Sequence, residues 1–546
     1  MDNYLKSAIS KIYGKGEDFI ILGLTGRTGS GCSTVARILQ NKDLNHTLFS
    51  GDTPSNNEER KEKIISKHFK KSWESFSLIQ VRSVLTLIFS ECGSDEALKY
   101  INSLSIDIEK ETEFKDKLDK INSDSKGKDI KQFYTVELPK SCEDIKNILG
   151  ESAFVKLYQK IGTNLRMSGK PTEEQLVEGK FFTLAEKINV ILKDIKKANK
   201  EEGKNTFIVV DAIRSPLEAM FFQERYSAFY LMAVSCSDEN RKERLRKLKY
   251  TEDDIVRLDE QEYKRRNLKA TSSFSVQDIQ ACLQKADLYI SNPNEENAVS
   301  EFKTLTKQVI KFTSLMKRPG LISPTALERC MQIAYTAKLN SGCISRQVGA
   351  VITDSNFSIQ AVGWNDTPYG QVPCNLRNRH DLISGKDQAA YSCFEKNDEE
   401  FLSFAAKNAP KYISLEEDGR NSSYCFKTEY NTLKDKDNQV HTRSLHAEEN
   451  AFLQISKYGG RGIEGGYLFT TASPCELCAK KAYQLGIKKI YYIDPYPGIA
   501  TNHILMAGVN NPELILFSGA IGRAFHLLYT PVVAYKDEMN ALTDNI

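Results

Sequence analysis

The chain has 546 residues, which at roughly 100 to 200 residues per domain suggests two or more globular units. Hydrophobic residues make up 40% of it, charged residues 27% and aromatic residues 10%, so a disordered, collagen-like or coiled-coil chain is excluded. The formal net charge of +3 gives no general electrostatic reason to bind a polyphosphate backbone.

No window of about 18 residues is apolar enough to cross a bilayer, and the first residues lack the apolar core of a signal peptide. We therefore expect a cytoplasmic protein with no membrane partner. In that reducing compartment the 12 cysteines are not expected to form a disulfide framework, so each should be buried, reactive or bound to a metal.

The first half of the chain predicts an α/β fold, with a parallel sheet and helices on both of its faces. Short apolar runs at 19–24, 207–210, 228–234 and 286–290 are typical of buried strands, and helical stretches separate them. The stretch 106–131 is dense in Lys, Asp and Glu, which predicts a solvated helical arm or loop without a functional role.

A glycine-rich turn with the sequence GRTGSGCST, residues 26–34, follows the first predicted strand and opens a helix. It matches a phosphate-binding Walker A loop at every fixed position except Cys32, which stands where lysine belongs. Its backbone amides predict an anion site, Ser33 would hold Mg²⁺, and Asp211 has the place of a Walker B carboxylate. The candidate nucleotide-binding residues are Gly26, Gly29, Ser30, Gly31, Cys32, Ser33, Thr34 and Asp211.

Cys32 leaves this loop without the cation that reaches the β and γ phosphates during phosphate transfer. Arg27, or an arginine of the segment 241–246, would be the substitute. An intact loop without its lysine predicts a domain that binds a nucleotide and regulates activity. Whether any kinase activity remains, and which nucleotide binds, stays open.

Asn292-Pro293-Asn294 and Arg318-Pro319-Gly320 interrupt the pattern, and we expect a nucleotide-binding domain over 1–316 and a second domain over 317–546. The sequence of the second domain predicts an α/β/α arrangement with a mixed five-stranded sheet. The polar stretch 369–440 is long for a loop, which predicts a lid or a regulatory insertion. The expected elements are a helix over 324–339, a hairpin of strands 347–353 and 357–364, and strands over 467–471, 488–493 and 514–517.

One imidazole and two thiols occur at zinc-ligand spacing, as His446, Cys475 and Cys478. Three protein ligands leave a fourth position open for water, as in a catalytic rather than a structural zinc site. Ser473 and Pro474 are typical of a helix N-cap and first turn, so both thiols are expected at a helix start, where the dipole favours thiolate.

Glu448 lies two residues from a ligand and is not needed for coordination, which makes it the expected proton shuttle. The order H-x-E followed by P-C-x-x-C is typical of zinc nucleobase deaminases. In that chemistry activated water adds to C4 of cytosine, the glutamate carries protons to N3 and to the exocyclic amine, and ammonia leaves to give uracil. A structural zinc or a redox Cys-x-x-Cys is the alternative, and neither requires the glutamate.

The stretch Ala326–Pro531 resembles deoxycytidylate deaminases through SRQVGAVI at 345–352, GWNDTP at 363–368, HAEENA at 446–451 and the Pro-Cys-x-x-Cys segment. The resemblance implies that Asn365 binds the deoxyribose or base, that the backbone of Ala447 contacts the base, and that Tyr496 lies near the substrate. Some members hold a second, structural zinc. We do not predict that site, because the candidates form no tightly spaced pair: Cys343, Cys374, Cys393, Cys425, His380 and His441.

The first domain resembles deoxynucleoside monophosphate kinases and related P-loop kinases through IGTNLR at 161–166 and VDAIR at 210–214. Together, the two halves resemble the two-domain deoxycytidine nucleotide deaminases of bacterial anti-phage defence. That resemblance implies an enzyme that converts dCTP and dCMP to uracil nucleotides, depletes dCTP during infection, forms a homo-oligomer and is held inactive by a small RNA.

Other functions remain open at this point. One is a housekeeping enzyme that combines dCMP deaminase and deoxynucleotide kinase activities. A polynucleotide-editing deaminase would need a basic, aromatic-lined groove, which the sequence does not indicate. A nucleotide sensor with a scaffolding zinc domain would have no use for Glu448. The preference between dCTP and dCMP is also open.

Overall fold

The computed structural model describes residues 7–8, 11, 18–44, 53–127, 129–262, 277–295, 302–459, 462–494 and 500–543. The chain divides into two compact units, the first comprising Met1–Ser323 and Ser518–Ile546, and the second comprising Pro324–Phe517. Among the helices of the described residues, none combines the length and the apolar character that a membrane span requires.

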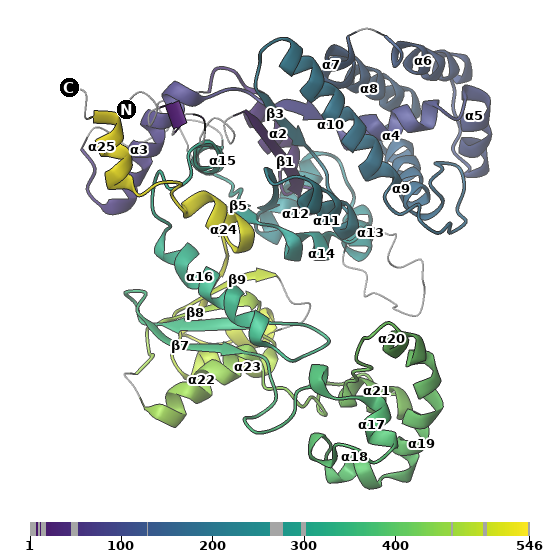
Figure 1. Cartoon of the computed structure of the whole chain (residues 1–546). Helices are drawn as coiled ribbons and strands as arrows, with labels where there is room; N and C mark the ends of the chain where they lie inside the picture. Colours follow the sequence, from purple (N-terminus) through teal and green to yellow (C-terminus); the bar gives the residue numbers. More distant parts are fainter. Residues whose placement is uncertain are drawn as a thin grey trace. The chain divides into compact units, whose positions relative to one another are not determined.

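The first unit is built on a six-stranded sheet with the strand order β11-β5-β4-β1-β3-β2 (Figure 1). Strands β1 to β5 run parallel, as predicted, and β11 is antiparallel to β5. The sequence analysis did not predict the short strands β2 and β11. The strands are β1 (Phe19–Thr25), β2 (Ser77–Ile79), β3 (Thr206–Val210), β4 (Phe229–Ser235), β5 (Leu288–Ser291) and β11 (Gly519–Ala520).

Helices cover both faces of this sheet, because alternate residues of its strands bury two separate sets of side chains. Ile20, Leu22 and Leu24 of β1 share one hydrophobic cluster with residues of α2 (Cys32–Gln40) and α15 (Lys303–Lys317). On the other face, three helices contact β3, β4 and β1. They are α10 (Thr183–Glu201), α11 (Pro216–Arg225) and α14 (Ile279–Lys285).

Between β2 and β3 the chain forms a helical layer in which α4 packs against α6, α8 and α9. The charged stretch predicted as a solvated arm lies here as α6, and the expectation of full solvation is wrong because Phe114, Leu118 and Ile121 are buried. The layer comprises α4 (Val81–Ser90), α5 (Ser94–Ser103), α6 (Glu111–Asp124), α7 (Ile130–Gln132), η2 (Phe133–Glu137), α8 (Leu138–Leu149) and α9 (Glu151–Ser168). The other helices of this unit are α3 (Asn57–Ser72), α12 (Asp238–Lys247), α13 (Glu252–Glu262), α24 (Gly522–Tyr529) and α25 (Tyr535–Thr543).

The last segment of the chain, Ser518–Ile546, packs with the first unit, whereas the sequence analysis placed all of 317–546 in the second domain. β11 pairs with β5, and Arg523 donates hydrogen bonds of 2.7 to 2.9 Å to three backbone carbonyls of the segment 223–229. Helix α24 also contacts α15. A two-residue strand carries no periodic pattern, so the sequence could not indicate this return of the chain.

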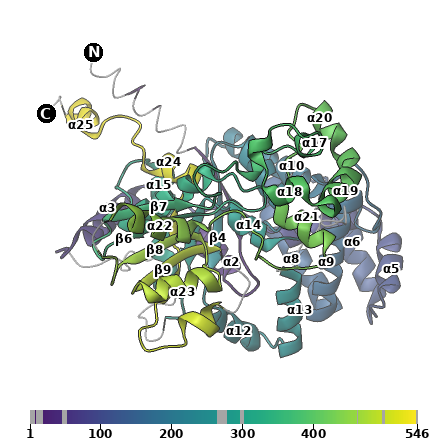
Figure 2. The same ribbon diagram turned by 90° about the horizontal axis from the view of Figure 1, so that it is seen from below.

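The second unit contains a mixed five-stranded sheet, as predicted, and its strand order is β10-β9-β8-β6-β7. Figure 2 labels β6, β7, β8 and β9 of this sheet. β6 is antiparallel to β7 and β8, whereas β8, β9 and β10 are parallel. Ala350 and Ile352 of β6 join a hydrophobic cluster with α22 (Ala447–Tyr458) and α23 (Glu476–Gln484), while α16 (Ala326–Ala337) packs on the other face. The strands are β6 (Gly349–Thr353), β7 (Ile359–Trp364), β8 (Tyr467–Ala472), β9 (Lys489–Asp494) and β10 (Glu513–Leu516), and the short helices η4 (Lys338–Asn340) and η8 (Thr501–Leu505) flank them.

Residues 374–433 fold into short helices with a hydrophobic core of their own, within the stretch predicted as a lid or insertion. We call this part the helical insertion. Two buried arginines, Arg377 and Arg379, lie over the ring of Tyr424, with guanidinium carbons 4.5 and 5.5 Å from the ring centroid. Its helices are η5 (Cys374–Leu376), α17 (Arg379–Ile383), η6 (Gln388–Ala390), α18 (Cys393–Asn397), α19 (Glu399–Asn408), η7 (Ala409–Tyr412), α20 (Ile413–Glu417) and α21 (Phe426–Leu433).

Candidate active site

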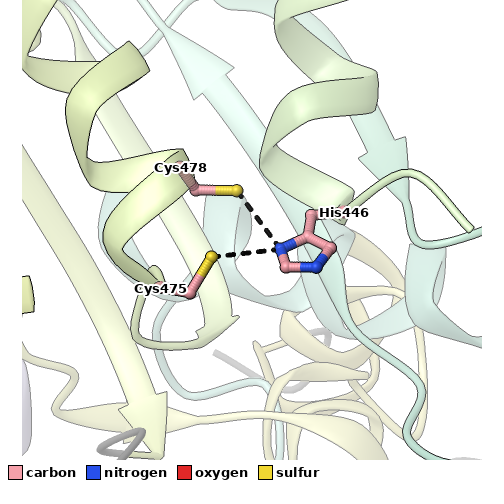
Figure 3. A group of neighbouring side chains, drawn as sticks. All are labelled: His446, Cys475 and Cys478. Atoms are coloured by element: carbon pink, nitrogen blue, oxygen red, sulfur yellow. Dashed lines mark hydrogen bonds between the residues drawn. The ribbon is translucent and has the colours of Figure 1, made fainter. Parts of the chain in front are cut away.

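The three predicted metal ligands meet at the ends of two helices (Figure 3). His446 is the N-cap of α22 and Cys475 is the N-cap of α23, so the second helix begins two residues later than Ser473 and Pro474 had suggested. The sulfur atoms of Cys475 and Cys478 lie 3.3 and 3.4 Å from Nδ1 of His446. All three ligand atoms lie within 4.8 Å of one another, and no second such group occurs among the described residues.

The donor set fits a zinc ion. At the usual Zn–S and Zn–N distances of about 2.3 and 2.0–2.1 Å, tetrahedral coordination separates sulfur and nitrogen by about 3.5 Å, close to the observed spacing. The hydrogen bond with Cys478, followed by that with His446, lowers the pKa of Cys475 to about 3, so this thiol is disposed to bind as a thiolate. Three ligands leave one position for water, as catalytic zinc requires.

Glu448 lies in the first turn of α22 and is only 4% exposed. The Thr470 hydroxyl is 3.0 Å from Glu448 Oε1 and 2.8 Å from the carbonyl oxygen of Ala472. Burial raises the pKa of the Glu448 carboxyl above its ordinary value. A buried carboxyl of raised pKa beside a metal ligand is suited to accept and release a proton near neutral pH.

Close backbone packing holds α22 against β7. A side chain at Gly363 would place its Cβ 2.3 Å from the carbonyl oxygen of Ala447 and 2.5 Å from the amide nitrogen of Ala451. Only glycine therefore allows the helix start to approach the strand. Asn450 adds a 2.9 Å hydrogen bond from its side-chain amide to the carbonyl of Trp364.

Two of the metal ligands, His446 and Cys475, line a cavity of about 410 Å³ together with Glu448. Asn365 and Ala447, carried over from the family resemblance as substrate contacts, line the same cavity. The Asn365 side chain also holds the chain before β6, accepting from the Val348 amide at 2.6 Å and donating to the Arg346 carbonyl at 2.7 Å. Tyr496, the third such residue, lies outside the described residues.

Three further cysteines, Cys343, Cys374 and Cys425, line this cavity. A hydrogen bond between Cys374 and Cys425 raises the pKa of the first and lowers that of the second to about 5. The other candidates for a second zinc, Cys393, His380 and His441, are not part of the cavity wall.

Comparison with known proteins decides the family of this unit. Residues 324–494 match the model of the cytidine and deoxycytidylate deaminase zinc-binding region. The deoxycytidylate deaminase of Enterobacteria phage T2 is 32% identical over 168 residues, which are 30% of this chain and 78% of the relative. The chain belongs to the deoxycytidylate deaminase family. It is a zinc-dependent deaminase, as the zinc-ligand spacing predicted.

Two other similar proteins come from phages. The deoxycytidylate deaminase of Enterobacteria phage T4 is 31% identical over 167 residues, which are 30% of this chain and 76% of the relative. Among solved structures, the dCMP deaminase of cyanophage S-TIM5, in complex with dCMP and dUMP, is 23% identical. That match covers 36% of this chain and 99% of the cyanophage chain, with a TM-score of 0.22.

The cavity of the deaminase also contains residues that the sequence did not single out. Thr470 contacts the carboxylate of Glu448, while Lys427 and Arg443 line the wall contributed by α21 and by the segment before His446. Arg443 stands three residues before a metal ligand, which is the one signal that the sequence offered for it.

In the first unit of the deaminase, the predicted glycine loop joins the end of β1 to the start of α2, and we call residues 26–31 the glycine loop. The loop lies at the carboxyl ends of β1 and β3, where open α/β sheets bind ligands. Gly31 has a φ of 113°, and a Cβ there would lie 2.1 Å from Nδ2 of Asn292.

A cavity of about 540 Å³ opens on this loop. Of the predicted nucleotide-binding residues, it is lined by Gly26, Gly29, Gly31, Cys32, Ser33, Thr34 and Asp211. Ser30 is buried and is not part of the wall; its carbonyl accepts a 2.8 Å hydrogen bond from the Asn292 side chain.

Burial shifts the pKa values of one thiol and one carboxyl group at this cavity. Burial raises the pKa of Cys32 to about 11, so a neutral thiol occupies the position of the missing lysine. Burial also raises the pKa of Asp211, whose Oδ1 accepts a 2.9 Å hydrogen bond from the Val81 amide.

A carboxylate of α13 is bound to the glycine loop. Oε1 of Glu262 accepts hydrogen bonds from the backbone amide and the hydroxyl of Thr28, at 2.9 and 2.6 Å. Arg214 lies 3.7 Å from the same oxygen. The Glu262 side chain is 4% exposed, so a negative group of the protein is enclosed at a loop expected to bind phosphate.

The arginines considered as substitutes for the lysine are engaged with other groups. Arg27 lines the cavity but pairs with Asp238 and Asp259 at 3.0 and 2.6 Å. Arg244 also lines it and donates to the Asn292 carbonyl at 2.9 Å, whereas Arg241 is 1% exposed and pairs with the same two aspartates.

Proposed function

We propose that the second unit converts deoxycytidine nucleotides to deoxyuridine nucleotides, with dCMP and dCTP as the substrates. The observation that carries the proposal is the placement of Glu448 in one cavity with the metal ligands His446 and Cys475. The relatives from phages T2 and T4 bear the name deoxycytidylate deaminase, which supports the choice of a deoxycytidine nucleotide.

When bound, zinc supplies Lewis-acid activation of water near neutral pH. The Glu448 carboxylate takes one proton from the attacking water and delivers it to N3 of cytosine, then takes the second and delivers it to the departing amine. Oxygen becomes bonded to C4 and the C4–N4 bond breaks, so cytosine and water give uracil and ammonia. The backbone of Ala447 and the Asn365 side chain would orient the nucleoside for this reaction.

The test is to incubate the purified, zinc-loaded chain with dCMP, dCTP, CMP, deoxycytidine and a cytosine-containing single-stranded oligonucleotide. Chromatography of the products and an ammonia assay would follow the reaction. We expect rapid turnover of the deoxynucleotides and slow turnover of deoxycytidine, because the phosphate supplies remote binding energy. Equal rates on the oligonucleotide and on dCTP would favour a polynucleotide-editing enzyme and refute this proposal.

We propose further that the first unit is a P-loop kinase-like domain that binds a nucleoside phosphate with Mg²⁺, has little kinase activity, and regulates the deaminase. The cavity on the glycine loop supports the binding, and the neutral thiol of Cys32 supports the loss of transfer. A ligand can regulate only by favouring one of two deaminase states. Rapid phosphate transfer to a deoxynucleoside monophosphate by the full chain would refute the regulatory role.

Ser33→Ala is expected to weaken nucleotide binding about tenfold, because a hydrogen bond to a charged group contributes about 1.5 kcal/mol or more. Calorimetric titration of the full chain with a magnesium nucleotide measures the change. Ser103→Ala, an exposed serine of α5, is the control and should bind as the parent does. Unchanged affinity in Ser33→Ala would exclude the hydroxyl as a magnesium ligand, and zinc content should not change in either variant.

Glu262→Gln is expected to tighten nucleotide binding about tenfold, because the substitution removes a negative charge that competes with phosphate for the Thr28 amide and for Arg27. The same titration measures it. Asp253→Asn, an exposed acid of the same helix, is the matched control. Weaker binding in Glu262→Gln would instead identify the carboxylate as part of the nucleotide site.

We propose that the physiological role is depletion of dCTP as an antiviral, anti-phage defence, with a homo-oligomeric enzyme held inactive by a small RNA until infection. The resemblance of the two halves of the chain to the two-domain deoxycytidine nucleotide deaminases of anti-phage defence supports this role. None of the twelve cysteines forms a disulfide, which supports a reducing, cytoplasmic setting. Measurement of dCTP in phage-infected cells with and without the gene tests the role, and copurifying RNA and the solution mass test the partners.

A further inference from the structure

The cavity of the deaminase unit is lined by side chains of both charges. Its acidic wall residues, Glu448 and Glu476, stand beside the metal ligands in the sequence. Its basic wall residues are Arg346, Lys427 and Arg443. Arg346 is paired with the buried carboxylate of Asp494, so its charge is already balanced.

Lys427 is different, because its ammonium group acts on the thiol of Cys425, whose pKa it helps to lower, and not on a carboxylate. Its Nζ donates a 3.0 Å hydrogen bond to Oε1 of Gln439, a neutral group that also lines the cavity. In the described part of the chain, no carboxylate lies within ion-pair distance of Lys427. The helical insertion thus brings an ammonium group without a carboxylate partner to the wall of the deaminase cavity.

Arg443 carries a second surplus charge. Its guanidinium lies 3.4 Å from Oε2 of Glu395, which is 1% exposed. Glu395 is already paired with Arg377, and its Oε1 accepts a 2.8 Å hydrogen bond from the Tyr424 hydroxyl. One buried carboxylate therefore faces two guanidinium groups, and one positive charge remains at the cavity.

We infer that Lys427 and Arg443 form a polyphosphate subsite, which makes the deaminase prefer a deoxycytidine triphosphate to the monophosphate. This inference rests on the proposed function and specifies its substrate. A phosphate monoester carries a charge of about −1.5 to −2 near pH 7, and a triphosphate carries more. Lys427, which has no carboxylate partner, and Arg443, which shares one with Arg377, match the longer tail, with arginine as a planar phosphate donor and lysine as a point charge.

The position of the pair supports the same conclusion. Arg443 is three residues before His446, and three extended residues span at most about 10 Å, so its backbone is held near the metal ligands. Lys427 comes from α21 of the helical insertion and lines the same cavity. A cytosine held at Glu448 would thus extend its phosphates toward groups that arrive from two different segments.

The test compares Lys427→Gln and Arg443→Gln with the parent on dCTP, dCMP and deoxycytidine. We expect each variant to lose at least tenfold in kcat/KM on dCTP, mainly through KM, and less than threefold on dCMP and deoxycytidine. Lys436→Gln is the matched control, because it removes one positive charge from an exposed position just beyond α21. Glu395 keeps Arg377 and Tyr424 in Arg443→Gln, so the fold should survive.

A second measurement does not depend on turnover. Inorganic tripolyphosphate should bind the zinc-loaded parent and Lys436→Gln alike, and at least tenfold more weakly to Lys427→Gln. Equal losses on dCTP and dCMP would assign the pair to the first phosphate and overturn the triphosphate preference. Equal losses on all three substrates, or none, would overturn the subsite. Charge-dependent tripolyphosphate binding by a chain that deaminates no nucleotide would refute the proposed function and leave the subsite standing.

Discussion

Replacing Glu448 with glutamine is expected to lower the deamination rate by at least 10²- to 10⁴-fold while zinc stays bound. General acid–base catalysis contributes about this factor, and glutamine cannot accept a proton at Oε1. The ligands His446, Cys475 and Cys478 remain in place, so the metal site is retained. Steady-state kinetics on dCMP and dCTP, together with zinc analysis of the purified variant, measure both halves of the prediction.

Two further variants test whether the loss of activity is specific to Glu448. Glu513→Gln alters an exposed glutamate of β10 that pairs with Lys489, and it should leave both rate and zinc content unchanged. Cys475→Ala should lose zinc and activity together, because it removes a ligand. Near-native turnover by Glu448→Gln would exclude the proton shuttle, and loss of zinc from this variant would make Glu448 a structural part of the metal site.

Gly363→Ala is expected to destabilise the second unit by about 3 kcal/mol and to reduce both zinc content and activity. The added Cβ meets two backbone atoms of α22, and backbone cannot turn aside as a flexible side chain can. The helix start that holds His446 and Glu448 must therefore move away from β7. Urea denaturation followed by circular dichroism, with zinc analysis of the folded variant, measures the effect.

Gly462→Ala is the matched control in the same unit, since a Cβ at that position meets no atom within 4 Å. It should change stability by only a few tenths of a kcal/mol. A Gly363→Ala protein with the stability and zinc content of the parent would show that α22 can shift without disturbing the metal ligands.

Much of the site was predictable because its chemistry is encoded in short segments. His446, Glu448, Cys475 and Cys478 lie within two helix starts, and zinc coordination requires those residue types at close spacing. The parallel and mixed sheets were predictable for a similar reason, since their longer strands are continuous apolar runs bounded by turns.

The remaining features depend on contacts between distant segments. Lysine and arginine number 75 in this chain, so the sequence does not distinguish Lys427 from a solvated charge, and it marks Arg443 only by its place near His446, until the fold brings both to one cavity. Glu262 was not singled out in the sequence either, because its carboxylate reaches the glycine loop from a position 234 residues along the chain from Thr28. The helical insertion was expected as irregular chain because its helices are too short for a clear period.

The return of the chain to the first unit has a consequence for the order of folding. During synthesis, the edge of β5 and its neighbouring core are available long before their partners β11 and α24 leave the ribosome. The intervening residues 324–517 have a sheet and a core of their own and can fold during this interval. The first unit therefore reaches its full stability only after β11 and α24 have left the ribosome, and a nascent chain stalled before residue 518 would expose the unpaired β5 edge to chaperones and to aggregation.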